Sequence, residues 1–289
     1  MTSPSGRGHD ETVKPTIWHG GRPSQASTSS RGSAFLDPVP AAGGQSGGRS
    51  MAADPLIRVT GLRKTFGKHR VLDGLDVDVH GGEALAVLGA NGAGKTTLLK
   101  ILATLVRPTH GTATVAGYDC AKDAESVRRH VGLVAHGAYV YEDLTALENL
   151  TFWTTLAGLH ASAAARAGAL ASVELERFAG ERVRTFSAGM KRRLSLARFV
   201  LARPRVLLLD EPFAGLDQRA KKWLEEHLAS FKSRGGAIVM ATHSFGRELG
   251  VADRIAILAG GVIALDTPRG ALSAEDIQRL YALHTEDAL

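Results

Sequence analysis

From residue 56 onward, short apolar runs alternate with longer segments of helical periodicity. Short apolar runs are typical of strands buried in a sheet. The sequence predicts strands at 56–59, 84–88, 112–115, 131–134, 206–209 and 237–241. Residues 75–79 alternate apolar and charged side chains, which predicts a half-exposed strand. The apolar runs 254–258 and 262–265 flank two glycines and predict a hairpin.

Helical segments are expected between these strands. They lie at 95–106, 123–130, 217–233 and 273–284. The Ala- and Leu-rich segment 143–202 predicts several further helices, the first of them capped by Asp143 or Thr145. Because strands that alternate with helices form a mostly parallel sheet covered on both faces, the pattern predicts an α/β fold.

Residues 1–54 differ from the rest of the chain. Ser, Gly, Pro and Arg dominate there, and such a segment cannot bury enough apolar surface to offset its ordering entropy. We therefore expect a disordered N-terminal extension over 1–54 and one folded domain over 55–289. Met51 lies just before the first predicted strand, so an alternative is that translation starts at Met51.

Composition narrows the class of protein. The 289 residues carry a net charge of +6, and residues 1–50 supply +2 of it (five basic minus three acidic residues). This dispersed excess favours a solvated basic surface over nucleic-acid binding. The single cysteine, Cys120, excludes a multi-cysteine zinc site and favours a reducing, cytoplasmic compartment. No apolar run approaches the roughly 20 residues that cross a bilayer, so a membrane role would need a separate membrane subunit.

The stretch 84–97 carries the most specific chemistry. A predicted strand runs into Gly89-Ala90-Asn91-Gly92-Ala93-Gly94-Lys95-Thr96-Thr97, and a predicted helix follows. This fits the phosphate-binding motif G-x-x-x-x-G-K-[ST] in its required context. Glycines let the backbone amides turn inward, and the helix N-terminus adds partial positive charge. Lys95 would reach the β- and γ-phosphates of a nucleotide, and the Thr96 hydroxyl would hold Mg²⁺.

Two carboxylates follow a buried strand further along the chain. Asp210 and Glu211 come directly after the apolar run 206–209. In a parallel sheet this strand end lies at the same edge as the phosphate loop. Asp210 would then meet Mg²⁺ through water, and Glu211 would orient or deprotonate the water that attacks the γ-phosphate.

A third motif lies shortly before this pair. Ser187-Ala188-Gly189-Met190-Lys191 resembles the signature motif of ATP-binding cassette (ABC) ATPases, whose common form is LSGGQ. Ser187 and Gly189, which that family uses on the γ-phosphate, are present, whereas neighbouring positions differ from the common form. Taken without the other motifs, the string would instead predict a helix cap.

Further motifs of the ABC family occur in the family's order. Ala214-Gly215-Leu216-Asp217 resembles the D-loop, His243 matches the switch histidine, and Phe66 matches the aromatic residue that stacks on adenine. The resemblance covers about residues 55–268. It implies that Phe66 and residues 89–97 bind ATP, and that Lys95, Glu211 and His243 act in its hydrolysis.

The resemblance also implies a fold and a mode of assembly. The expected fold is α/β: a P-loop NTPase of the ABC ATPase type, with a mostly parallel core sheet, an N-terminal antiparallel β part and an inserted helical subdomain at about 137–203. Two such cassettes pair head to tail, so a homodimer or a pair with a homologous ABC subunit is expected. Integral membrane permease subunits are the expected partners, at the cytoplasmic face of the cell membrane.

The Q-loop departs from the family pattern. Ala135-His136-Gly137 follows the strand 131–134, where the family normally places Gln. His136 is therefore a candidate metal ligand, although imidazole prefers softer metals than Mg²⁺, and the alternative is a loop histidine that faces solvent. With the string Leu144-Thr145-Ala146-Leu147-Glu148-Asn149-Leu150, this histidine resembles the ATP-binding subunit of the haem exporter in cytochrome c maturation.

These resemblances predict an ATP-hydrolysing subunit that energises export through separate membrane subunits. Haem export in cytochrome c biogenesis is the first interpretation, and a general multidrug-type efflux system is the alternative. A soluble ABC ATPase acting on nucleic acid is the rival class, but neither a long insertion nor zinc cysteines are visible, so no nucleic-acid partner is expected. A regulatory nucleotide-binding protein without turnover is a third class, against which Glu211 and His243 argue.

Overall fold

The computed structural model describes residues 54–134 and 140–286. The expectations for the N-terminal extension up to residue 53, including a start at Met51, and for His136 lie outside these residues. Within the described part of the chain, no helix has both the length and the apolar character needed to cross a membrane.

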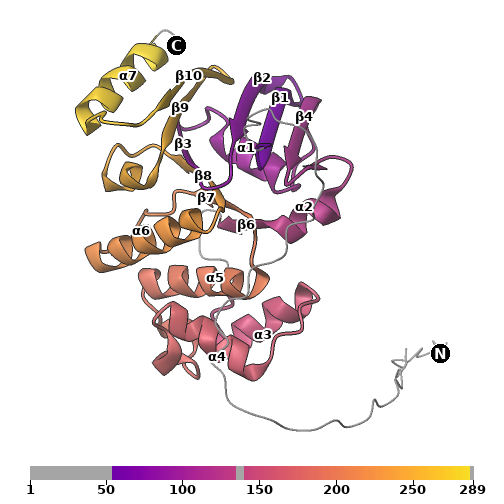
Figure 1. Ribbon diagram of the computed structural model, residues 1–289, viewed down its shortest axis with the longest axis vertical. Helices are drawn as coiled ribbons and strands as arrows, with labels where there is room; N and C mark the ends of the chain where they lie inside the picture. The colour runs from indigo at the N-terminus through magenta and orange to yellow at the C-terminus, as the bar shows by residue number, and fades with distance from the viewer. Residues whose placement is uncertain (1–53, 135–139, 287–289) are drawn as a thin grey trace, which may run out of the picture. The chain divides into compact units, whose positions relative to one another are not determined.

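Two β-sheets form the framework (Figure 1). The first is antiparallel and has the strand order β2 (His69–Val79), β1 (Ile57–Phe66), β4 (His110–Val115) and β5 (Tyr118–Asp119). The second has the order β10 (Val262–Pro268), β9 (Arg254–Ala259), β3 (Ala84–Leu88), β8 (Ala237–Thr242), β7 (Val206–Asp210) and β6 (Val131–Val134). Its strands pair in parallel from β9 to β6, and β10 pairs antiparallel with β9. This topology confirms the predicted mostly parallel core sheet and the N-terminal antiparallel part.

Helices occupy the segments between the strands. They are α1 (Lys95–Leu102), α2 (Ala124–His130), α3 (Ala146–Leu156), α4 (Ala163–Ser172), α5 (Ala188–Ala202), α6 (Gln218–Ser233) and α7 (Ala274–Glu286). Short 3₁₀ turns occur at η1 (Glu176–Phe178), η2 (Val183–Thr185) and η3 (Arg247–Val251).

Alternate residues of the core strands point into two separate hydrophobic cores. Leu85 and Val87 of β3 pack with the apolar face of α1 and with the antiparallel sheet, so α1 lies between the two sheets. Ala86 and Leu88 of the same strand point to the opposite face, which α6, η3 and α7 cover. Because both faces of the strand are covered, every residue of β3 is buried.

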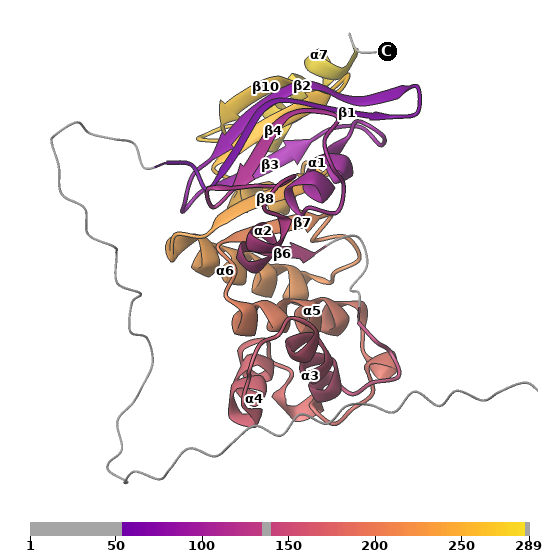
Figure 2. The ribbon, with the colours of Figure 1, turned by 90° about the vertical axis from the view of Figure 1, so that its right-hand side faces the viewer.

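A third core belongs to the helical segment between β6 and β7. Leu150 of α3, Leu170 of α4 and Leu194 of α5 are fully buried and belong to this cluster. The first helix begins with a capping box: the Thr145 hydroxyl accepts from the Glu148 N–H, and the Glu148 carboxylate accepts from the Thr145 N–H. Figures 1 and 2 show α3, α4 and α5 grouped beyond β6, the edge strand of the core sheet.

Three of the expected elements have wrong boundaries. The helix expected over 95–106 ends at Leu102, because Thr104 adopts a left-handed backbone with φ of 62°. Strands β1 and β2 extend well beyond 56–59 and 75–79. They pair along their whole length through register shifts, one of them next to Gly74 (φ 90°), and these irregularities obscure the alternation of apolar and polar residues.

Candidate nucleotide-binding site

The loop after β3 needs glycine at two positions for steric reasons. A Cβ on Gly89 would lie 2.6 Å from the carbonyl oxygen of Leu258. Gly94 has φ of 109°, and a Cβ there would lie 2.7 Å from Cδ2 of Leu72. Helix α1 begins at the next residue, and its first turn carries no acidic side chain. Its N-terminal amides and their positive dipole end are therefore available to an anion such as a phosphate.

Lys95 is buried at the base of this loop. Its side-chain Nζ donates to the carbonyl oxygens of Gly89, at 2.6 Å, and Ala90, at 3.0 Å. Burial lowers the pKa of Lys95, and the carboxylates of Glu211 and Asp210 oppose that shift. A bound phosphate would stabilise the charged ammonium further, which favours anion binding at this position.

Thr96 and Asp210 form an oxygen-rich pair beside Lys95. The Thr96 hydroxyl donates to Oδ2 of Asp210 at 2.9 Å, and Asp210 is buried at the end of β7. A hydroxyl and a carboxylate are hard oxygen donors of the kind that Mg²⁺ takes together with phosphate oxygens and water. The residues present therefore fit a magnesium ion bound with a nucleotide.

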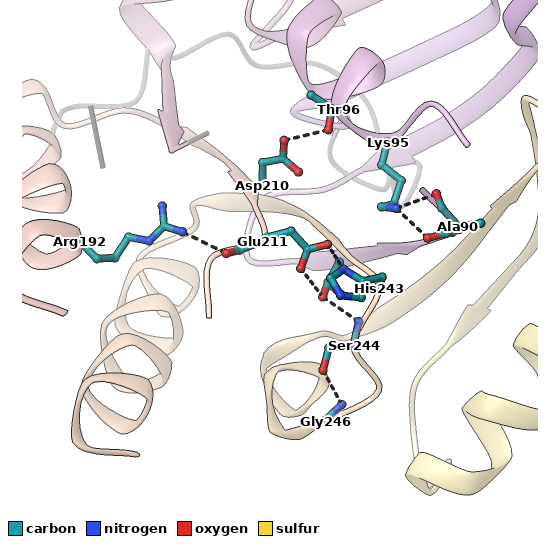
Figure 3. Close-up of polar contacts among 11 residues, drawn as sticks. Ala90, Lys95, Thr96, Arg192, Asp210, Glu211, His243, Ser244 and Gly246 are labelled. Atoms are coloured by element: carbon teal, nitrogen blue, oxygen red, sulfur yellow. Dashed lines mark hydrogen bonds and ion pairs between the residues drawn. The ribbon is translucent and has the colours of Figure 1, made fainter. Parts of the chain in front are cut away.

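Glu211 is held in an uncommon conformation at the strand end. Its φ of 48° lies in the left-handed region, which costs a non-glycine residue about 1–3 kcal/mol. Its N–H donates to the carbonyl of Ala241 at 2.9 Å. Its carboxylate accepts from the hydroxyl of Thr242 at 3.1 Å and contacts Nδ1 of His243 at 2.6 Å. Figure 3 shows Glu211 and His243 in contact beside Lys95 and Asp210.

These side chains surround one cavity of about 420 Å³. Its lining comprises Ala90, Asn91, Gly92, Gly94, Lys95, Thr96, Thr97, Asp210, Glu211 and His243. The loop after β3, the end of β7 and the end of β8 meet here because parallel strands bring their carboxyl ends to one edge of the sheet. Most of the predicted phosphate, metal and hydrolysis residues thus share one site.

The predicted signature residues do not line this cavity. Ser187 is exposed and caps α5, where its hydroxyl accepts from the N–H of Met190 at 3.2 Å. Gly189 follows in the first turn of the same helix.

Phe66, the predicted adenine-stacking residue, also lies outside the lining of this cavity. It ends β1 with 47% of its surface exposed, and the ammonium of Lys64 lies 4.6 Å from its ring centroid. An exposed aromatic face is suited to stacking on a base.

Sequence reasoning missed two contributors to the site. Thr242, the last residue of β8, is buried and donates to Glu211. Arg192 of α5 is also buried, and its Nη2 donates to the backbone carbonyl of Glu211 at 3.0 Å (Figure 3). The position of Thr242 next to His243 is a usable sequence signal. Arg192 stands in the basic run 191–193 and has no such signal.

Comparisons with known proteins agree with this geometry. The sequence profile described as "ABC transporter" matches residues 72–214. The daunorubicin resistance ATP-binding protein DrrA3 of Streptomyces coeruleorubidus is 38% identical over 228 residues, covering 77% of this chain and 71% of the relative. The chain belongs to the ABC transporter family. It is thus an ATP-binding, ATP-hydrolysing transport subunit.

Two further comparisons support the family. The doxorubicin resistance ATP-binding protein DrrA of Mycobacterium tuberculosis is 38% identical over 214 residues, covering 73% of this chain and 65% of the relative. A solved structure of an ATP-binding subunit of an ABC transporter superposes with a TM-score of 0.68 and 30% identity, covering 80% of this chain and 96% of the other. DrrA3 and DrrA are both named for drug resistance, so the finer resemblance to a haem exporter has no support here.

Proposed function

We propose that this ABC ATPase energises the export of drug-like molecules through separate membrane subunits. The observation that carries the proposal is its 38% identity to ATPases named for daunorubicin and doxorubicin resistance. The multidrug-type alternative therefore replaces haem export as the preferred interpretation. His136, the residue that suggested haem export, lies outside the described residues.

The residues around the cavity have complementary roles in the proposed ATPase cycle. Lys95 and the amides of the loop bind and neutralise the β- and γ-phosphates. Thr96 and Asp210 would hold Mg²⁺, and that ion would supply positive charge to neutralise the charge that develops on the phosphates. Glu211 orients the attacking water, and His243, 2.6 Å from its carboxylate, holds that carboxylate in place. Phe66 stacks on the adenine.

We further propose that the site is completed by a second cassette. Ser187 and Gly189 lie at the exposed start of α5, outside the cavity that holds Lys95 and Glu211. The N-terminus of α5 can receive a phosphate presented by another subunit. A homodimer or a pair with a homologous ABC subunit would provide that arrangement.

A second cavity supports the proposed contact with membrane permease subunits. It measures about 610 Å³ and lies among α1, β6, α3 and α5. Its lining includes the apolar residues Leu105 and Leu156, which are 61% and 73% exposed. The basic residues Lys100 and Arg128 also line it. Exposed apolar side chains beside a cavity mark interaction sites, and this lining suits a partner helix with apolar and acidic residues. Such docking would place the chain at the cytoplasmic face of the membrane.

We also propose the domain division expected from the sequence. Residues 55–289 form the ATP-binding domain, and the helical subdomain spans about 137–203. The expected extension over residues 1–54 lies outside the described residues except for residue 54. The third hydrophobic core, formed by α3, α4 and α5, supports the helical subdomain as a unit with its own packing.

Drug accumulation in cells tests the proposed function. The full chain and its genomically adjacent permease would be expressed together, and the intracellular level of daunorubicin measured. We expect lower accumulation with the wild-type pair than with a pair that carries Glu211→Gln, and copurification of the permease from detergent-solubilised membranes. Equal accumulation for both pairs, together with active ATP hydrolysis, would contradict the proposed cargo class.

A further inference from the structure

Helix α5 connects the signature residues to the hydrolysis site of the same chain. Ser187 caps the helix, and Arg192 lies in its second turn. The side chain of Arg192 points inward, and the residue is only 7% exposed. The guanidinium lies beside Glu211, the residue that follows β7 (Figure 3). There its Nη2 donates to the carbonyl oxygen of Glu211 at 3.0 Å. The contact therefore joins the helix that begins with Ser187 to the backbone that carries the Glu211 carboxylate.

Glu211 needs such an anchor because its backbone is unfavourable. Its φ of 48° is uncommon for a residue with a side chain. The peptide group on its N-terminal side is held by the bond to Ala241. The carbonyl on its C-terminal side accepts from the N–H of Ala214 at 3.2 Å within the following turn, and from Arg192, the side-chain donor, at 3.0 Å. Thr242 and His243 hold the carboxylate itself. Rotation of Glu211 away from this conformation would break the bond from Arg192.

The chemistry of arginine suits this task. A guanidinium keeps its charge when buried, and it donates from a planar group whose direction is set by packing. A hydrogen bond from a charged donor to a backbone carbonyl is stronger than one from a neutral donor. The nearby Asp210 carboxylate opposes the lowering of the Arg192 pKa that burial causes.

We propose that Arg192 is a positioning residue, which holds the backbone of Glu211 in its left-handed conformation and thereby aims the Glu211 carboxylate at the attacking water. The inference rests on the proposed role of Glu211 in hydrolysis. It adds a connection within one chain, from the exposed signature helix to the residue that acts on the γ-phosphate.

The adjacent arginine provides a matched control. Arg193 also lies on α5, but its Nη1 donates to the carboxylate of Glu174 at 2.8 Å rather than to the hydrolysis site. Arg192→Ala and Arg193→Ala therefore remove the same group from neighbouring positions of one helix. A general disturbance of α5 would affect both variants, whereas the loss of positioning would affect only Arg192→Ala.

Steady-state ATP hydrolysis and equilibrium ATP binding of the full chain test the proposal. For Arg192→Ala we expect kcat to fall between about tenfold and a hundredfold, because a misplaced group near the reaction costs that much, with the Kd for ATP within about twofold of wild type. For Arg193→Ala both quantities should stay within about twofold. Arg192→Lys, which keeps a charged donor, should recover part of kcat and serves as the test variant if Arg192→Ala fails to fold.

Three outcomes would overturn the proposal. One is an unchanged kcat in a folded Arg192→Ala variant. Another is a fall in kcat matched by an equal rise in the Kd for ATP, which would indicate damage to the nucleotide site. The third is an equal loss in Arg193→Ala. Glu211→Gln is measured in parallel: if it remains active, the proposed role of Glu211 fails, whereas an inactive Glu211→Gln with a normal Arg192→Ala refutes only the positioning role.

Discussion

The phosphate-loop region and the signature region are built in opposite ways, although each is proposed to contact the γ-phosphate of an ATP molecule. Lys95, Thr96, Asp210 and Glu211 meet at one edge of a sheet that is buried on both faces, and each makes a hydrogen bond within the site. Ser187 instead lies at the exposed start of α5 and bonds to its own helix. The first region is organised by the tertiary structure of one chain, and the second by a local helix cap.

In the proposed composite site, one chain would hold its phosphate-loop half in a fixed geometry. Burial and parallel strands position the phosphate-loop half before any ligand arrives, which lowers the reorganisation needed for catalysis. The signature half faces outward, and in the proposed composite site it would depend on docking against a second cassette. The contact between Arg192 and Glu211 is the exception, since it joins the two regions within the same chain.

The largest expected effect concerns the phosphate-loop half. Glu211→Gln removes the carboxylate that is proposed to act on water but keeps the size of the side chain, so the rate of hydrolysis should fall by about 10²–10⁴. ATP binding should persist, because Lys95 and the loop amides are unchanged. Phosphate release and equilibrium ATP binding would be measured together. Hydrolysis near the wild-type rate would remove Glu211 from the proposed mechanism.

A mixing experiment tests whether the two halves come from different chains. Lys95→Ala disables the phosphate loop and Ser187→Arg blocks the signature face, so each variant alone should lose most ATP hydrolysis. In a mixed homodimer one site combines an intact Lys95 with an intact Ser187. Mixing the two inactive proteins should therefore restore measurable ATPase activity. If coexpressed and copurified mixed dimers stay inactive, the composite site in a homodimer is wrong.

A substitution of Phe66 should change the affinity for ATP without changing the rate of hydrolysis. Phe66→Ala removes an exposed aromatic face that the nucleotide base would cover, so the Kd for ATP should rise about fivefold, the equivalent of about 1 kcal/mol of stacking. Because Phe66 lies outside the hydrolysis cavity, kcat at saturating ATP should stay near the wild-type value. Titration of ATP in both binding and hydrolysis assays provides the measurement. An unchanged Kd would place the base elsewhere.

The smallest expected effect is on stability, and it comes from substitutions at two helix caps of similar geometry. The Thr145 and Ser187 hydroxyls each accept from the N–H three residues on, at 3.2 Å in both cases. Replacing either by alanine should cost about 1 kcal/mol of stability. For a domain of this size, the corresponding fall in Tm is about 2–4 °C. ATP hydrolysis should fall only in Ser187→Ala. Equal activity in both variants would leave Ser187 as a cap alone.

The sequence predicted an element or a site residue correctly where the whole motif or periodic pattern lies within one short stretch of the chain. The phosphate loop is recognisable because glycine, lysine and threonine stand at fixed offsets between a strand and a helix. The boundaries of α1, β1 and β2 were not predictable in this way. They depend on a left-handed Thr104 and on register shifts between paired strands, which arise from tertiary contacts rather than from residue periodicity.

By itself, the sequence determined that the chain is an α/β protein with a phosphate loop, a carboxylate pair and a signature motif. Short-range sterics and periodicity are sufficient for that, because they act between residues close together in the chain. Only the tertiary structure decided that Thr242 and Arg192 join Glu211, and that Ser187 stays outside the cavity. Those relations depend on which strand ends and helix turns meet after packing. Thr242 has a local signal in its position next to His243, whereas the hydrogen bond from Arg192 leaves no pattern in the local sequence.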